Sequence, residues 1–312
     1  MKETKEFDIV VVGAGPAGLT SALYTGRSGR SCIVLERLTV GGQVTLTDLI
    51  ENYPGFSKIS GEELAQRLID QVKLYSVPIE VKEVTRLINK GERKLVVTDE
   101  TDYIAKAVII ATGTKPKMLI VPGEKEFYGK GVSYCALCDG NFFKEKVVAV
   151  VGGGDSGVKE AIYLSRIARK VYLIHRRDRL KAEKALQLKA FQINNIEILW
   201  STVISSINGL DKVDSLTLKN LKTNESYKLP VEGVFIYVGL APNTSVFDVA
   251  KDKYDFIRVN DKMMTSIPGV FAAGDCVVQN SAGPWGQIST AVGDGAKAAI
   301  CADEYISKVL NE

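Results

Sequence analysis

Phe7-Asp-Ile-Val-Val-Val-Gly-Ala-Gly-Pro-Ala-Gly18 joins a short apolar segment to a glycine-rich motif. Residues 7–12 are typical of a buried parallel strand, and a helix is expected from Pro16 to Ser28, ending before Gly29. A further strand is expected at 31–35, which completes a β–α–β unit. Between a strand and a helix, Gly-x-Gly-x-x-Gly lets a dinucleotide pyrophosphate approach the backbone at the helix N-terminus. A tight turn without a ligand is the alternative interpretation, and the repetition of the motif argues against it.

The same plan starts again in the second half of the chain. A strand is expected at 146–151, followed by Gly152-Gly-Gly-Asp-Ser-Gly157, a helix over 155–168 and a strand at 171–174. The sequence therefore contains two internal repeats of one α/β plan. The other expected elements are a helix after the capping box Ser60-Gly-Glu-Glu63, an antiparallel meander at 81–103, a strand at 107–111, a helix at 180–192, short strands within 196–229 and a strand at 234–237.

The two repeats also end alike, because Ile109-Ile-Ala-Thr-Gly113 and Phe235-Ile-Tyr-Val-Gly239 each lead to a nearby proline. After the second one the chain gives only Gly269–Asp275 and a helix at 288–306. One strand and one helix cannot form a domain, so we expect them to dock on the first repeat. The predicted fold class is α/β, with two Rossmann-like dinucleotide domains, the second inserted into the first. The predicted bounds are 1–115 with 243–312 for the first domain and 116–242 for the second.

Composition and charge exclude several classes of protein. The chain has 312 residues and a formal net charge of +3, which is too weakly basic to indicate a nucleic-acid or membrane partner. Apolar runs such as 107–111 are too short to span a bilayer, and residues 1–8 lack the apolar core of a signal peptide. Five cysteines with one close pair do not form a secreted disulfide framework. We therefore expect a cytoplasmic protein in which a disulfide would be catalytic.

The ends of the second strands distinguish the two nucleotide sites. Glu36 lies 23 residues after the first glycine of the first motif, and His175-Arg-Arg177 begins 23 residues after the first glycine of the second. A carboxylate there binds free ribose hydroxyls and repels a 2′-phosphate, so the first site should hold FAD or NAD. Two guanidiniums suit a phosphate, so the second site should prefer NADP, although a solvated basic face is the alternative. Asp275, emerging after a strand and Gly274, could meet a ribitol hydroxyl, which favours FAD in the first site.

Cys135 and Cys138 stand three residues apart in Gly131-Val-Ser-Tyr-Cys-Ala-Leu-Cys-Asp-Gly140. Such a pair can lie on one turn and form a disulfide, and at a helix start its thiolates are favoured. Asp139 could pass protons as the dithiol forms and reacts. A zinc site is the strongest alternative, but the other three cysteines are scattered and the chain has one histidine, so no metal is predicted. The two nucleotides would then serve to deliver electrons to this pair.

With these motifs in view, the whole chain resembles the low-molecular-weight thioredoxin reductases of bacteria and archaea, which are FAD- and NAD(P)-dependent pyridine nucleotide-disulfide oxidoreductases. The resemblance also includes Gly41-Gly-Gln43 and Glu51-Asn-Tyr-Pro-Gly55. It implies a homodimeric enzyme that moves a hydride from NADPH to FAD and then two electrons to the Cys135–Cys138 disulfide. The dithiol would reduce a thioredoxin- or glutaredoxin-like protein, with Asp139 as proton donor and Cys138 facing the flavin.

The FAD contacts that the resemblance implies are Gly13, Gly15, Pro16, Ala17, Glu36, Arg37, Gly42, Gln43, Asn52, Val84, Thr112, Gly113, Gly274, Asp275, Gln287 and Ile288. The expected NADPH contacts are Gly154, Asp155, Ser156, His175, Arg176, Arg177 and Lys181.

Three positions depart from the family pattern. Lys181 stands where a third arginine is frequent, so binding of the 2′-phosphate should be weaker but retained. Gly286 stands where an arginine is common, and Leu137 replaces a frequent threonine. The alternatives are an NAD(P)H–ferredoxin reductase or NADPH oxidase type flavoprotein with idle cysteines, a donor other than NADPH, and a non-enzymatic redox-sensing module.

Overall fold

The chain folds into two compact units in the computed structural model, which describes residues 2–47, 49–279 and 286–309. Unit 1 comprises Met1–Lys115 and Ala241–Glu312, and unit 2 comprises Pro116–Leu240. The chain thus leaves unit 1, completes unit 2 and returns. The predicted fold class, α/β with the second unit inserted into the first, is confirmed. Which nucleotide each unit binds stays a prediction.

The sheet of unit 1 is built mainly from parallel strands. Its strand order is β3-β2-β1-β6-β5-β4, and β18 pairs with β6. Pairing is parallel among β1, β2, β3, β6 and β18, whereas β4, β5 and part of β6 form an antiparallel meander. The bounds are β1 (Glu3–Val12), β2 (Cys32–Glu36), β3 (Ile79–Val81), β4 (Arg86–Lys90), β5 (Arg93–Val97), β6 (Thr101–Ile110) and β18 (Val270–Ala272).

Strand β6 corrects the expectation of a meander ending at 103 and a separate strand at 107–111. It is a single strand of 10 residues, paired with β5 on one edge and with β1 on the other. Its burial alternates along the first part and is continuous over Ala107–Ile110. Along this strand the hydrophobic pattern changes from alternating to continuous, because both faces of its last part are buried. The single strand therefore has the sequence pattern of two separate strands.

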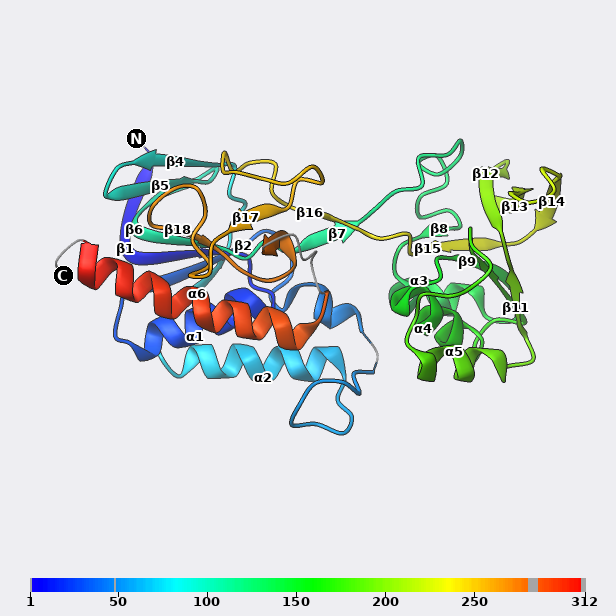
Figure 1. The fold of residues 1–312 in the computed structure, drawn as a ribbon, viewed down its shortest axis with the longest axis horizontal. Helices are drawn as coiled ribbons and strands as arrows, with labels where there is room; N and C mark the ends of the chain where they lie inside the picture. The colour runs from blue at the N-terminus through cyan, green and yellow to red at the C-terminus, as the bar shows by residue number, and fades with distance from the viewer. Residues whose placement is uncertain (1, 48, 280–285, 310–312) are drawn as a thin grey trace. The chain divides into compact units, whose positions relative to one another are not determined.

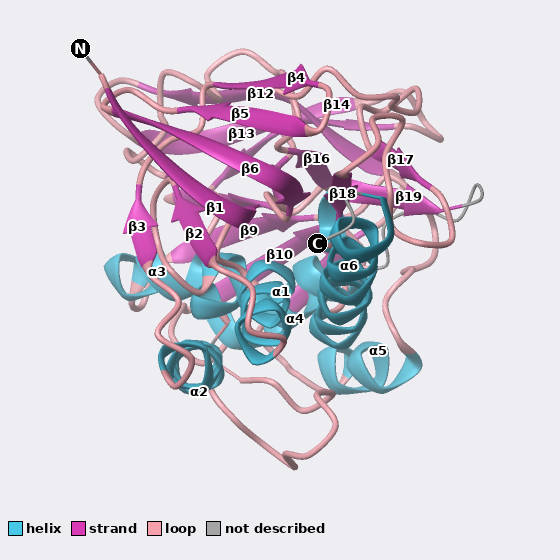
Figure 2. Ribbon diagram, turned by 90° about the vertical axis from the view of Figure 1, so that its left-hand side faces the viewer, coloured by secondary structure: helices cyan, strands magenta, loops and turns pink. Residues whose placement is uncertain are grey.

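The helices of unit 1 are α1 (Pro16–Arg27), α2 (Gly61–Lys73) and α6 (Ile288–Val309), and all three lie on one side of the parallel strands (Figure 1). α1 and α6 lie side by side (Figure 2), and a Cβ on Gly295 would stand only 2.2 Å from the carbonyl oxygen of Ala17. The predicted cap of α2 is confirmed, since Ser60 Oγ accepts a hydrogen bond from the Glu63 N–H at 3.1 Å.

No helix in the described part of the chain is long and apolar enough to cross a membrane. The shorter elements are η1 (Gly42–Leu46), η3 (Gly274–Cys276) and the paired strands β17 (Ile257–Val259) and β19 (Val277–Gln279).

Unit 2 is a five-stranded parallel sheet with a different layer on each face. The strand order is β11-β10-β9-β15-β8, and the strands are β8 (Val132–Ser133), β9 (Val147–Val151), β10 (Lys170–Ile174), β11 (Ile196–Leu199) and β15 (Gly233–Ile236). Val148 and Val150 of β9 pack against the helices α4 (Asp155–Leu164) and α5 (Lys184–Phe191). The alternate residues Ala149 and Val151 pack against an antiparallel sheet of β12 (Thr202–Gly209), β13 (Val213–Asn220) and β14 (Ser226–Pro230). Burial on both faces explains why β9 is apolar throughout.

Two helices of unit 2 are shorter than expected. α4 ends at Leu164 rather than at 168, and the next residues form hydrogen-bonded turns. α5 begins at Lys184 rather than at 180, because the N–H groups of Lys181 and Ala182 donate to the carbonyl oxygen of Gly153, at 2.7 and 3.1 Å. The remaining elements are α3 (Ala136–Asp139), η2 (Gly140–Phe143) and the pair β7 (Thr114–Pro116) and β16 (Leu240–Pro242), where the chain passes between the units.

Candidate active site

The turn between β1 and α1 requires glycine at two positions. Gly13 has a φ of +106°, and a Cβ there would stand 2.3 Å from the carbonyl oxygen of Ala111. A Cβ on Gly18 would stand 1.8 Å from the carbonyl oxygen of Gly13. Gly15, in contrast, has no atom within 4 Å of its Cβ position, and Pro16 begins the helix. The first N–H groups of α1 therefore border open space, which is the arrangement that binds a phosphate.

The carboxylate of Glu36 stands beside this turn at the end of β2. It accepts hydrogen bonds from the N–H groups of Ala14 at 2.7 Å and Leu38 at 2.9 Å. These bonds hold the Glu36 carboxylate at the position where we expect the adenosine ribose from the comparison of the two repeats. Arg37, the next residue, is exposed and forms an ion pair with Glu83 at 3.6 Å.

The returning chain brings Asp275 to the same end of unit 1. It follows Gly274, whose φ is +75° and whose Cβ would stand 2.8 Å from the Cβ of Ala17 at the start of α1. Asp294 of α6 supports this turn, because its carboxylate accepts a hydrogen bond from the Gly274 N–H at 3.3 Å. Burial and the neighbouring Asp294 raise the pKa of Asp275. Asp294 was not among the residues singled out from the sequence.

Two polar contacts join the return to the first part of the chain. Thr112 Oγ1 donates to the carbonyl oxygen of Asn243 at 2.7 Å, and Asn243 Nδ2 donates to the carbonyl oxygen of Thr112 at 3.1 Å. Asn52 Nδ2 donates to Gln287 Oε1 at 3.0 Å. Thr112, Asn52 and Gln287 were expected from the sequence, whereas Asn243 was not.

The other residues expected to contact FAD lie in several different environments of unit 1. A Cβ on Gly42 would stand 3.1 Å from Gly15 Cα, and Gln43 Nε2 donates to Thr114 Oγ1 at 2.9 Å. Gly113 has a φ of +58° and no atom within 4 Å of its Cβ position. Val84 is buried in the main core of unit 1, and Ile288 packs on the small cluster around Val44, so the structure gives these two a packing role.

The second glycine turn, in unit 2, repeats the geometry of the first. Gly152 has a φ of +135°, and its Cβ would stand 2.1 Å from the carbonyl oxygen of Tyr237. Gly154 precedes α4 and has no atom within 4 Å of its Cβ position. Ser156 is exposed in the first turn of α4, while Asp155 Oδ1 accepts a hydrogen bond from the Glu183 N–H at 2.8 Å.

His175 packs under this turn. A Cβ on Gly153 would stand 2.6 Å from His175 Nδ1, so only a glycine leaves room for the ring. The side chain is 8% exposed, and its Nε2 has no hydrogen-bond partner among the described residues. Burial lowers its pKa, and the nearby cations of Arg177, Arg176 and Lys181 lower it further. His175 is therefore a neutral packing residue at physiological pH.

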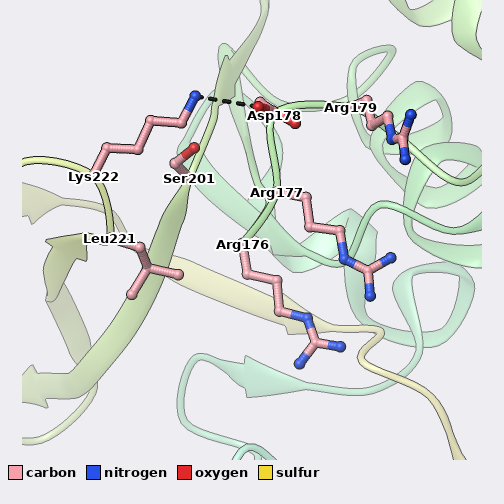
Figure 3. A pocket seen from close by; sticks show the side chains of 7 residues that line it. All are labelled: Arg176, Arg177, Asp178, Arg179, Ser201, Leu221 and Lys222. Carbon is pink, nitrogen blue, oxygen red and sulfur yellow. Dashed lines mark hydrogen bonds and ion pairs between the residues drawn. The ribbon is translucent and has the colours of Figure 1, made fainter.

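The turn after His175 forms a basic pocket of about 380 Å³ (Figure 3). The guanidinium groups of Arg176 and Arg177 extend to one side of it (Figure 3). On the other side, Lys222 Nζ lies 3.2 Å from Asp178 Oδ2. The pocket is lined by Arg176, Arg177, Asp178, Arg179, Ser201, Leu221 and Lys222. The last three come from distant segments, and nothing in the sequence indicates that they meet the arginines.

Cys135 and Cys138 form a disulfide at the start of α3. Cys135 is half-buried and Cys138 is exposed. Ser133 Oγ donates to Asp139 Oδ2 at 2.6 Å and accepts a hydrogen bond from the Cys135 N–H at 3.0 Å. The sequence singled out the cysteines and Asp139, whereas Ser133 was missed because a lone serine has no distinctive pattern.

Tyr237 is a second side chain at the disulfide that the sequence did not indicate. Its phenolic oxygen accepts a hydrogen bond from the Ala136 N–H at 2.8 Å. Burial raises the pKa of Tyr237, and the negative charges of Glu160 and Asp139 raise it further, so the phenol stays protonated.

The other cysteines have different surroundings. Cys32 and Cys276 are buried, and burial raises the pKa of Cys32 to about 12 and that of Cys276 to about 11. Both are therefore protonated and inaccessible, as expected of structural cysteines.

Comparison with known proteins gives a consistent result. The family model of the pyridine nucleotide-disulphide oxidoreductases matches residues 7–295. A thioredoxin reductase of Bacillus subtilis (strain 168) is 42% identical, over 99% of this chain and 98% of that protein. The solved structure of Lactococcus lactis thioredoxin reductase matches with a TM-score of 0.93 and 41% identity, over 97% of this chain and 99% of that one. The thioredoxin reductase of T. acidophilum matches with a TM-score of 0.92 and 39% identity, over 98% and 99% of the two chains.

Proposed function

This chain belongs to the pyridine nucleotide-disulphide oxidoreductase family and is an oxidoreductase, and on that premise we propose that it is an FAD-dependent thioredoxin-disulfide reductase that uses NADPH. Membership of the family implies a flavin and a nicotinamide cofactor. The observation that carries the proposal is the Cys135–Cys138 disulfide, which lies at the start of a helix in the unit that holds the second glycine turn.

The surroundings of the first glycine turn fit FAD. Open space above Gly15 leaves room for a pyrophosphate at the N-terminus of α1, and the fixed carboxylate of Glu36 suits ribose hydroxyls. The carboxyl group of Asp275 follows Gly274, which lies against Ala17 at the start of α1, so it could bind a ribitol hydroxyl of the flavin there. These residues would bind and orient the dinucleotide.

The surroundings of the second glycine turn fit NADPH. The turn has the same open space at Gly154, and the exposed guanidiniums of Arg176 and Arg177 are suited to a 2′-phosphate. Lys181 supplies a third cation on the segment that is hydrogen-bonded to Gly153. His175 would support the turn by packing under it rather than by contacting the nucleotide through a charge.

The bound cofactors supply the redox chemistry, which is hydride transfer from NADPH to FAD and two-electron reduction of the Cys135–Cys138 disulfide. One thiolate of the resulting dithiol attacks the disulfide of the protein substrate, forming a mixed disulfide and releasing one substrate thiolate. The second cysteine then attacks the mixed disulfide, which restores the enzyme disulfide and releases the substrate as a dithiol. Asp139 directly follows Cys138, and its carboxyl group is oriented by the hydrogen bond from Ser133 Oγ, so we propose that it moves protons to and from the sulfurs.

The substrate we propose is a thioredoxin- or glutaredoxin-like protein, which acts in the cytoplasm. The names of the similar proteins support a thioredoxin. The exposure of Cys138 and the half-exposure of Cys135 leave the pair accessible to a protein disulfide. A homodimer is proposed from the resemblance to this family.

An anaerobic titration of the FAD-loaded protein with NADPH, followed by flavin absorbance, tests the proposal. We expect about two electron pairs to enter each subunit, because flavin and disulfide both accept electrons. Uptake of a single pair would mean idle cysteines and would favour the oxidase or ferredoxin reductase alternative. A flavin bleached by dithionite but not by NADPH would show that the donor is a different molecule.

A cysteine variant separates the reductase from its rivals. Cys135→Ser should retain flavin reduction by NADPH and lose reduction of the protein disulfide. Cys301→Ser is the matched control, because Cys301 lies on α6 of unit 1 and should leave both activities unchanged. Retention of disulfide reduction by Cys135→Ser would contradict the proposal.

A further inference from the structure

One carboxylate interrupts the basic turn of unit 2. Asp178 stands between Arg177 and Arg179 in the sequence, and Arg177 is one of the two arginines proposed for the 2′-phosphate, so an unpaired Asp178 carboxylate would compete for that guanidinium. In the structure it pairs instead with Lys222, whose Nζ lies 3.2 Å from Asp178 Oδ2. Within the described ranges, neither Arg177 nor Arg179 forms an ion pair with a carboxylate.

The segment that carries Lys222 is linked by hydrogen bonds, through Ser201, to the turn that carries Asp178. The Ser201 N–H donates to the carbonyl oxygen of Arg177 at 3.1 Å, and the Leu221 N–H donates to the carbonyl oxygen of Ser201 at 2.6 Å. The Lys222 N–H donates to Asn220 Oδ1 at 2.8 Å, which closes the turn after β13. The lysine is therefore brought to Asp178 by a connected set of hydrogen bonds.

We propose that Lys222 is a positioning residue for nucleotide specificity: by pairing with Asp178 it keeps Arg177 free for a 2′-phosphate. The proposal rests on the proposed use of NADPH. Figure 3 supports it, because the Lys222–Asp178 pair lies on one side of the pocket and the guanidiniums of Arg176 and Arg177 extend to the other. Lys222 itself does not need to touch the nucleotide.

Removing the lysine gives a specific expectation. In Lys222→Ala, the Asp178 carboxylate loses its partner and can turn toward Arg177, where it competes with the phosphate. Because the side chains of Lys222 and Asp178 are 66% and 65% exposed, the effect should be modest, a rise of about two- to fivefold in KM for NADPH. It should shrink at high ionic strength, since salt screens exposed charges.

The test measures KM and kcat of the holoenzyme for NADPH and for NADH, at low and high salt. Lys222→Ala should raise KM for NADPH while leaving kcat and the KM for NADH unchanged. Lys222→Arg should behave as the wild type, and the double variant Lys222→Ala/Asp178→Asn should recover the wild-type KM. Lys228→Ala is the matched control, because Lys228 is 67% exposed on the neighbouring strand and pairs only loosely with Asp214, at 4.0 Å.

The outcomes separate this inference from the proposed function. If the wild type prefers NADPH and Lys222→Ala has the same KM as Lys228→Ala, the inference is wrong and the proposed function stands. An equal loss for NADPH and NADH, or no recovery in the double variant, would also overturn the inference, because a merely structural role has those effects. If the wild type does not discriminate between NADPH and NADH, the donor assignment itself is wrong.

Discussion

The phenolic oxygen of Tyr237 accepts a hydrogen bond from the backbone N–H of Ala136 at 2.8 Å, directly after the first cysteine of the disulfide. The carbonyl oxygen of the same tyrosine lies against Gly152, where a Cβ would approach it to 2.1 Å. One residue directly after β15 thus contacts both the start of α3 and the second glycine turn. The cysteine pair and the turn proposed to hold a nucleotide thus both lie at the carboxyl ends of neighbouring parallel strands.

Replacing Tyr237 with Phe should weaken the start of α3. The variant keeps the ring but removes the acceptor for the Ala136 N–H, which should lower the free energy of unfolding by about 1 kcal/mol. Chemical unfolding measures the change, and Tyr254→Phe, at an exposed tyrosine of unit 1, is the control. Equal stability of the two variants would show that water replaces the phenol at no cost.

The first glycine turn allows folding and cofactor binding to be separated. Gly13→Ala places a Cβ 2.3 Å from the Ala111 carbonyl oxygen at a φ of +106°, so it should lower the free energy of unfolding by about 1–3 kcal/mol or more. Gly15→Ala has open space for the Cβ and should fold normally, but the methyl group occupies the region proposed for the pyrophosphate. The ratio of flavin absorbance to protein absorbance, with thermal unfolding of the apoprotein, distinguishes the two effects. A full flavin content in Gly15→Ala would contradict the assignment of this turn.

The single histidine should make stability depend on pH in a narrow window. Burial lowers the folded-state pKa of His175 below the unfolded value of about 6.5, so the unfolded chain binds the proton first as the pH falls. Stability is therefore complete above about pH 6.5 and decreases as the pH drops toward the folded-state pKa. Titration of the one imidazole signal by NMR should give a midpoint below 6.5. His175→Gln should lose this part of the pH dependence of unfolding, and a midpoint at or above 6.5 would contradict the burial argument.

The sequence predicted the elements that carry a local pattern. Strands of the two repeats, the glycine turns, Ser60 as a helix cap and the cysteine pair all have signals within a few residues. It could not predict that β6 is continuous, because its burial changes along its length. The contacts of Lys222 with Asp178 and of Asp294 with Gly274 could not be predicted either, since they depend on how distant segments pack. His175 shows the same limit: its position in the repeat indicated a nucleotide contact, a lone histidine is more often a packing residue, and only the tertiary structure shows that it packs against Gly153.

The carboxylate next to the disulfide gives the last prediction. Asp139 accepts a hydrogen bond from Ser133 Oγ at 2.6 Å, and Ser133 Oγ in turn accepts one from the Cys135 N–H at 3.0 Å, so this carboxylate is connected to the backbone of a reacting cysteine. Asp139→Asn keeps the shape but cannot exchange a proton, and it should slow reduction of thioredoxin by the pre-reduced enzyme about 100-fold or more. Ser133→Ala removes only the orienting hydroxyl and should slow the same step less. Rapid mixing of pre-reduced enzyme with oxidised thioredoxin measures this step separately from electron entry, and Ser206→Ala, on β12, controls for loss of a hydroxyl elsewhere in unit 2. If Asp139→Asn reduces thioredoxin at the wild-type rate, protons reach the sulfurs from water, and the carboxylate has only the structural role of holding Ser133.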